Sequence, residues 1–209
     1  MIATLTFNPR SWNLSGLNGI SDATLETHFG LYEGYVKNTN LLREQLAETL
    51  ERGKPTGIDP RFAELQRRLG FELGGMRLHE LYFDNLTTKQ TELVDGGGLH
   101  AGMQHVWGKV ATWRSEFAAM GEMRGVGWVM LAQDPWSGDL SNHWVELHQD
   151  GNVPGFIPIL VMDVWEHAWI KDYAPKARAS YVEAFLSNVD WNLCEERMRA
   201  AYPEGVRVP

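Results

Sequence analysis

The chain has 209 residues, of which 44% are hydrophobic and 22% are charged, and its formal net charge is −8. This length suits one domain, or two small ones that share a core. The negative balance argues against a general nucleic-acid binder, which normally carries a basic patch, and the sequence contains no apolar run near the ~20 residues of a membrane span.

Two helices joined by a turn are predicted for the first part of the chain. After an irregular arm of about 20 residues, one apolar stripe with helical spacing runs over about 21–52 and a second over about 60–87. Ser21 or Asp22 can cap the first helix, and Pro60 suits the first turn of the second. The segment GKPTGIDP between them breaks the helix, so we expect an antiparallel helical hairpin.

One histidine lies on the apolar stripe of each predicted helix. Counted from Thr56 in the turn, His28 lies 28 residues before it and His79 lies 23 residues after it. The difference is roughly 7–8 Å of helix, which an asymmetric turn can absorb. A single histidine on an apolar face is usually a core residue, whereas a shared metal ion explains two at the same level more simply.

The second half of the chain predicts helices and a small sheet. After a linker that ends in three glycines, we expect a helix over about 99–122 and a final helix from near Pro175. Between them lie three strand-like runs, 125–133, 143–149 and 157–164. The short connections between these strands favour an antiparallel meander.

Alternation along the middle strand assigns its side chains to two faces. Val145, Leu147 and Gln149 share one face, and His148 belongs to the other. If Val145 and Leu147 face the core, Gln149 points inward beside them and His148 points away.

The most hydrophobic stretch, ILVMDVWEHAW (159–169), contains an aspartate and a histidine four residues apart. This spacing puts Asp163 and His167 on one side of either a helix or a strand. A buried carboxylate needs a partner, which here is a hydrogen bond between the two, a positive side chain or a metal ion. Together with His28 and His79 they form a set of three imidazoles and one carboxylate, which suits iron, manganese or zinc.

Aromatic and polar side chains are available to surround such a site. Trp128, Trp165 and Trp169 can wall it against bulk water. Tyr35 follows the first histidine by seven residues, almost two helical turns, so its phenol can serve as an outer donor. Gln149 can reach solvent on the metal.

These motifs resemble those of the iron/manganese superoxide dismutase family. DVWEHAW is similar to the family signature D-x-W-E-H-A-[FYW], while LETHFGLYEGYVKNTN, GGMRLHELYFDNL and GVGWVML resemble its first-ligand helix, second-ligand segment and first strand. The likeness covers about residues 20–195. It implies four metal ligands, which are His28, His79, Asp163 and His167, and two residues of the cavity wall, Trp128 and Trp165. It also implies a gateway tyrosine at Tyr35, an outer glutamine at Gln149, a funnel arginine at Arg178 and a glutamate at a dimer interface at Glu166.

Several positions depart from the family pattern. Tyr35 follows His28 by seven residues instead of eight, which we interpret as one deletion that a regular helix accommodates. Tyr32 and Ile170 stand where many members carry a histidine and a tyrosine that bond across the dimer interface, which puts proton delivery and the dimer contact in doubt. Phe83 replaces a common tryptophan, which is a mild change.

The resemblance also bears on the metal. Gly75 stands where the iron-type pattern carries a glutamine, and the candidate Gln149 comes from the sheet, as in the manganese type. We therefore expect one manganese or iron ion per subunit and favour manganese. Arg178 is either the funnel arginine or an ordinary surface charge at the start of a helix.

The sequence thus predicts an α+β fold, with a helical-hairpin domain (1–90) packed on an α/β domain (91–209) that contains a three-stranded antiparallel sheet. The resemblance implies a superoxide dismutase that converts superoxide to oxygen and hydrogen peroxide by ping-pong redox cycling, in a homodimer or a homotetramer. The alternatives are a catalytically inactive protein of the same fold and a non-haem iron oxygenase, against which the third histidine counts. The single cysteine, Cys194, and the lack of a signal-peptide pattern favour the cytoplasm, and no nucleic-acid or membrane partner is expected.

Overall fold

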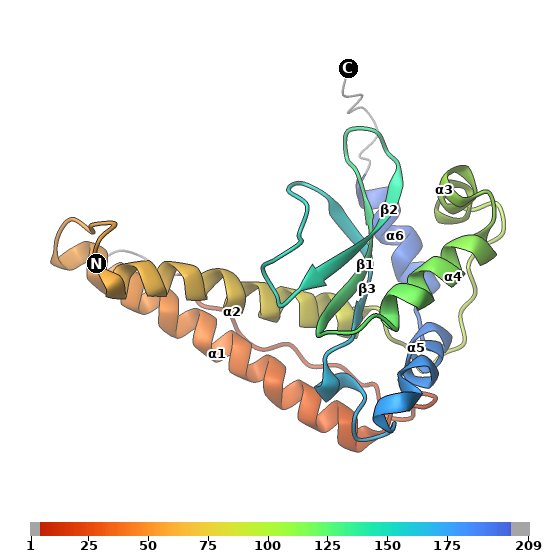
Figure 1. The fold of residues 1–209 in the computed structure, drawn as a ribbon, viewed down its shortest axis with the longest axis horizontal. Coiled ribbons are helices and arrows are strands. Elements are labelled where there is room, and N and C mark those ends of the chain that lie inside the picture. The colour runs from red at the N-terminus through yellow and green to blue at the C-terminus, as the bar shows by residue number, and fades with distance from the viewer. Residues whose placement is uncertain (1–4, 202–209) are drawn as a thin grey trace.

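The structure is a computed structural model that describes residues 5–201. A long helical hairpin extends from a more compact part that contains one small sheet and four shorter helices (Figure 1). The α-helices and strands are α1 (Asp22–Arg52), α2 (Pro60–Asp84), α3 (Gly98–Trp107), α4 (Val110–Gly121), β1 (Gly127–Gln133), β2 (Leu140–Glu146), β3 (Ile157–Asp163), α5 (Arg178–Ser187) and α6 (Trp191–Ala201). Short 3-10 turns cover Glu166–Ala168 and Pro175–Ala177. The predicted α+β fold is confirmed.

Local capping chemistry sets where the two hairpin helices begin. The Ser21 hydroxyl accepts a hydrogen bond from the backbone N–H of Thr24, and the Asp59 carboxylate accepts one from Arg61. Pro60 occupies the first turn of α2, where its missing N–H costs nothing. Both predicted helices are therefore confirmed, with the second ending three residues earlier than expected.

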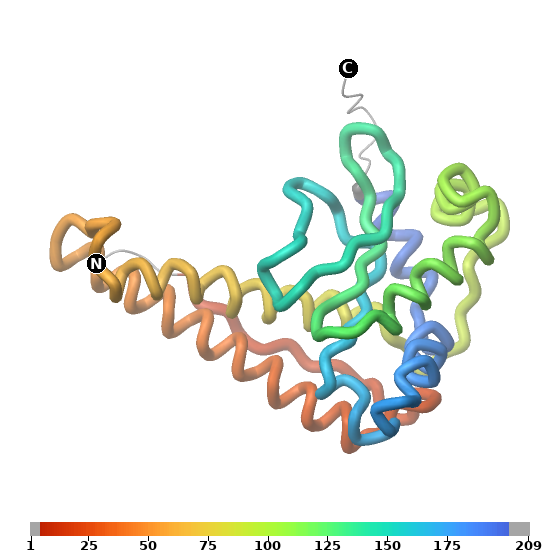
Figure 2. Tube along the Cα trace, viewed as in Figure 1, coloured from red at the N-terminus to blue at the C-terminus, as the bar shows by residue number. Residues whose placement is uncertain are grey.

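The N-terminal arm lies along the hairpin as an extended strap (Figure 2). Phe7 and the side chain of Asn40 exchange two hydrogen bonds of 2.9 and 2.8 Å. The Arg10 guanidinium binds both carboxylate oxygens of Asp84 at the end of α2. The first four residues of the predicted arm lie outside the described part of the chain.

The sheet is antiparallel, as expected, but it is not a meander. Its strand order is β2-β1-β3, so both outer strands pair with β1. Every residue of β1 is buried, whereas β2 is only partly buried. A strand that is apolar on both faces is best covered at the centre of a sheet, and the connection 147–156 is long enough to carry the chain across to the other edge.

The helical segments of the second half differ from expectation in two places. The single helix predicted over 99–122 is divided into α3 and α4 at Gly108, whose φ of 74° is in the left-handed region that ends helices. The chain also forms α6 after α5, which was not predicted. Arg197 of α6 donates to the backbone carbonyls of Leu81 and Ile159, and so ties the end of α2 to β3.

One continuous core joins the hairpin to the rest of the molecule. It includes Leu25 and Met76 from the hairpin, Leu131 and Val161 from the sheet, and Phe185 from α5. The division into domains 1–90 and 91–209 stays a prediction. Within the described part of the chain, none of the helices is long and apolar enough to cross a membrane.

Candidate metal centre

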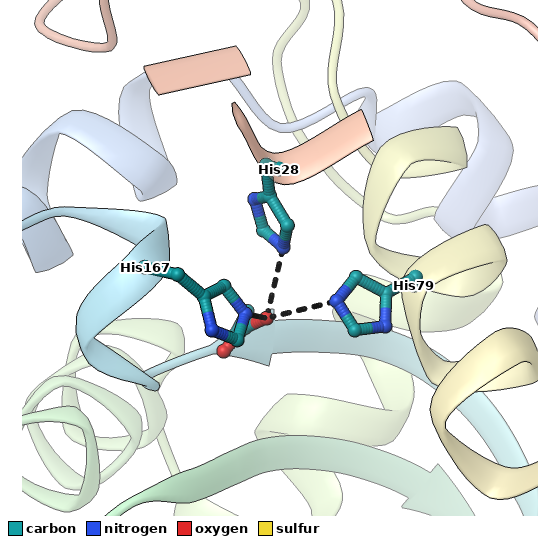
Figure 3. Close-up of side chains that lie close together, drawn as sticks. His28, His79 and His167 are labelled. Atoms are coloured by element: carbon teal, nitrogen blue, oxygen red, sulfur yellow. Dashed lines mark hydrogen bonds and ion pairs between the residues drawn. The ribbon is translucent and has the colours of Figure 1, made fainter. Parts of the chain in front are cut away.

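The four predicted ligands converge on one point between the hairpin and the sheet. His28 comes from α1, His79 from α2, Asp163 from the last residue of β3, and His167 from the 3-10 turn that follows (Figure 3). One ligand atom from each residue lies within 4.8 Å of all the others. The Asp163 Oδ2 atom is 3.0 Å from His28 Nε2, 3.1 Å from His167 Nε2 and 3.8 Å from His79 Nε2.

The aspartate is held as an anion in the interior of the protein. Burial alone would raise the pKa of Asp163, but the attraction and hydrogen bonds of His167 and His28 outweigh it and hold that pKa well below its usual range. Its second oxygen, Oδ1, accepts the backbone N–H of Trp165 at 2.8 Å. The carboxylate therefore carries a charge that the site must balance.

The histidines are prepared to donate lone pairs to a cation. The His79 Nδ1–H donates to the carbonyl of Gly75 at 2.6 Å, which leaves Nε2 without a proton. That buried Nε2 has no hydrogen-bond partner among residues 5–201. Burial lowers the pKa of both His28 and His79, so both rings are neutral at neutral pH, as metal ligation requires.

The donor set fits a first-row transition metal. Three imidazole nitrogens and one carboxylate oxygen face a common space, and the cluster includes no cysteine. Nitrogen and oxygen donors suit manganese, iron and zinc, and a cation there would pair with the lone pair of His79 that is otherwise unsatisfied. The residues therefore fit a single metal ion.

Comparison with known proteins identifies the family. The model of the iron/manganese superoxide dismutase C-terminal domain matches residues 95–197. An iron superoxide dismutase of Cupriavidus metallidurans is 34% identical over 192 residues, which cover 88% of this chain and 91% of the relative.

The chain belongs to the iron/manganese superoxide dismutase family.

Other relatives are named for either metal. An iron superoxide dismutase of Aquifex pyrophilus is 33% identical over 198 residues, covering 88% of this chain and 87% of the relative. A manganese superoxide dismutase of Haloferax volcanii is 34% identical over 174 residues, covering 83% and 84%. Their names therefore support the family without selecting one metal.

In this protein, a second group of side chains surrounds the four metal-ligand candidates. The Tyr35 hydroxyl lies 2.7 Å from His148 Nε2, and the Trp128 indole N–H points at His148 Nδ1 from 3.1 Å. The Trp165 ring stacks on His148 with centroids 5.0 Å apart and on His167 at 5.9 Å. Burial lowers the pKa of His148 to about 4 and raises that of Tyr35 to about 12.

The prediction for Gln149 and His148 is wrong. His148 is fully buried, whereas Gln149 is exposed. The strand ends at Glu146, and Leu147 has a φ of 53°, so the alternation on which the prediction relied stops one residue too early. The Asp150-Gly151 pair is a turn signal that indicates an earlier strand end.

Arg178 is half-buried, and Glu166, the neighbour of His167 in the sequence, is exposed. Together with Trp169 and Lys176 they line a cavity of about 440 Å³. Arg178 donates to the carbonyl of Gly125 at 3.0 Å, so its guanidinium is anchored at the cavity wall.

The positions that depart from the family pattern have partners of their own. The Tyr32 hydroxyl donates to the Glu80 carboxylate at 3.0 Å and accepts the backbone N–H of Arg10. The Tyr32 hydroxyl therefore has both of its hydrogen-bond partners within the same chain. Ile170 is 43% exposed. Phe83 packs against His28, with ring centroids 4.8 Å apart.

Proposed function

We propose that this protein is a superoxide dismutase that binds one manganese or iron ion through His28, His79, Asp163 and His167. The observation that carries the proposal is the convergence of these four donor atoms within 4.8 Å, three of them from buried residues, in a chain of this family. The reaction converts two superoxide anions and two protons into oxygen and hydrogen peroxide.

A manganese or iron ion held by the four ligands would supply a centre that changes its oxidation state by one electron. The protein has to deliver the two protons that the second superoxide requires. Tyr35, whose pKa burial raises to about 12, keeps its hydroxyl proton at neutral pH and is the hydrogen-bond donor that we place beside the centre. His148, which bonds to Tyr35, takes the outer position that we first assigned to Gln149.

The walls of the site favour a small anion. Trp128 is fully buried, and Trp165 stacks on a ligand ring, so both limit the space in front of the centre. Arg178 is proposed to attract superoxide electrostatically against the net charge of −8. An ordinary charge at the start of α5 is the alternative role for this half-buried residue.

The choice between the two metals stays open in this proposal. Gln149 lies at the surface and gives no support for manganese, although Gly75 still departs from the iron-type pattern. We further propose a homodimer or homotetramer with Glu166 at the dimer interface, and a cytoplasmic location. The dimer rests on the family resemblance, and the location on the single cysteine.

The test is reconstitution of the metal-free protein with manganese, iron or zinc, followed by a superoxide-consumption assay. We expect activity with manganese or iron and none with zinc, which does not change oxidation state. His167→Ala should lose metal and activity together, whereas His105→Ala, at a site with a 77% exposed side chain, should keep both. Stoichiometric manganese and iron binding without activity would instead support the inactive alternative. Sensitivity of the active form to hydrogen peroxide would then help to separate iron from manganese.

A further inference from the structure

The two ring nitrogens of His148 face different partners. An indole N–H is a donor only, and that of Trp128 points at Nδ1 from 3.1 Å while it also reaches the carbonyl of Leu147 at 3.0 Å. A proton on Nδ1 would place two N–H groups against each other, both directed at the Leu147 carbonyl that Trp128 already uses. The lone pair of His148 is therefore on Nδ1, and the neutral ring carries its proton on Nε2.

This tautomer fixes the direction of the next hydrogen bond. The His148 Nε2–H donates to the Tyr35 oxygen at 2.7 Å, so that oxygen is the acceptor. The phenol proton must then point elsewhere. The Tyr35 ring lies 5.0 Å from the ring of His79, so Tyr35 borders the centre.

We infer that Trp128 is a positioning residue, whose indole N–H selects the tautomer of His148 and so leaves the Tyr35 proton free to be donated at the centre. The recipient of that proton rests on the proposed function, whereas the tautomer does not.

The other rings around His148 hold its plane but cannot select its tautomer. Trp165 stacks on it at 5.0 Å and Phe71 packs at 4.5 Å. The indole N–H of Trp165 has no hydrogen-bond partner in the described part of the chain. Trp165 is thus a matched control for Trp128, with the same ring near His148 but without the directing bond.

The test is ¹⁵N NMR of the histidine rings in the full chain loaded with diamagnetic Zn²⁺. A ring nitrogen without a proton resonates well downfield of one with a proton, and loss of signals in His148→Gln assigns this residue among the seven histidines. In the unmodified protein we expect the downfield signal at Nδ1 of His148. Its appearance at Nε2 would overturn the inference even if no variant other than His148→Gln folds.

Three variants then identify the residue that sets the tautomer. Trp128→Phe keeps the aromatic wall but removes the indole N–H from the Leu147 carbonyl. That carbonyl can then accept Nδ1–H of His148, so we expect the downfield signal to move to Nε2. Trp165→Phe should leave it at Nδ1. Tyr35→Phe should also leave it there, and a move in that variant would make Tyr35, not Trp128, the selecting residue.

The outcome separates this inference from the proposed function. A folded Trp128→Phe protein with an unchanged Nδ1 signal would refute the role of Trp128, whatever the dismutase assay gives. Conversely, the expected tautomer changes in a protein that does not consume superoxide with manganese or iron would leave this inference intact and refute the function.

Discussion

Replacement of Gly75 by alanine should displace the Tyr35 side chain. A Cβ atom at position 75 would lie 2.6 Å from Cδ1, 2.8 Å from Cε1 and 3.0 Å from Cγ of Tyr35. The ring would have to move from 2.6 Å to the 3.4 Å at which ordinary contact begins, a shift of about 0.8 Å. That shift would stretch the 2.7 Å bond from Tyr35 to His148 beyond a normal hydrogen bond.

The expected loss of stability follows from three terms. Overpacking of a core costs about 1–3 kcal/mol, and loss of the hydrogen bond adds about 1 kcal/mol. Alanine in place of glycine inside a helix returns about 1 kcal/mol. We therefore expect Gly75→Ala to destabilise the protein by about 1–3 kcal/mol, or to lower Tm by roughly 2–12 °C for a chain of this size.

Thermal unfolding of the metal-free protein measures this change, with Gly34→Ala as the matched control. Gly34 is also inside a helix, but a Cβ atom there would meet nothing within 4 Å. This control should be stabilised by about 0.5–1 kcal/mol. Equal stabilisation of both variants, or a Gly75→Ala structure with the Tyr35–His148 bond intact, would refute the reasoning.

Three further predictions concern pH, metal and charge. Because burial lowers the pKa of His148 from 6.5 to about 4, the unfolded chain binds a proton in this window that the folded chain does not. The free energy of unfolding should therefore fall as pH drops from 6.5 to 4, and it should fall less in His148→Gln. Urea unfolding at several pH values measures this, and an equal dependence on pH in the two proteins would contradict it. Removal of the metal should lower Tm by roughly 8–16 °C, since an ion at about 1,000 times its Kd contributes about 4 kcal/mol, and an unchanged Tm after chelation would speak against a bound ion. Arg178→Gln should lower kcat/KM severalfold at low ionic strength, with a difference that shrinks as salt is added; a salt-independent effect would exclude electrostatic attraction.

The hairpin and the ligand set could be predicted because their signals are local. Ser21 and Pro60 mark the starts of two helices through the chemistry of their own first turns. Counting from the turn placed His28 and His79 at one level, and their Nε2 atoms lie 3.0 and 3.8 Å from the same Asp163 oxygen. The spacing of Asp163 and His167 in the most hydrophobic stretch indicated the remaining two ligands, and the family signature agreed.

The sheet order and the identity of the outer histidine could not be predicted in the same way. Strand order depends on which strand the helices cover on both faces, and that is decided by contacts far apart in the sequence. The position of His148 depends on one residue, because the left-handed Leu147 ends the alternation and turns the next side chain inward. A slip of one residue exchanges the two faces of a strand, so Gln149 was chosen in its place.

Anomalous diffraction from crystals of the purified protein, recorded at the manganese and iron edges, tests the central claim most directly. We predict one strong peak per chain, roughly 2 Å from the Nε2 atoms of His28, His79 and His167 and from one Asp163 oxygen. A map without a peak at this point from protein saturated with either metal, or a peak bound by other residues, would contradict the account.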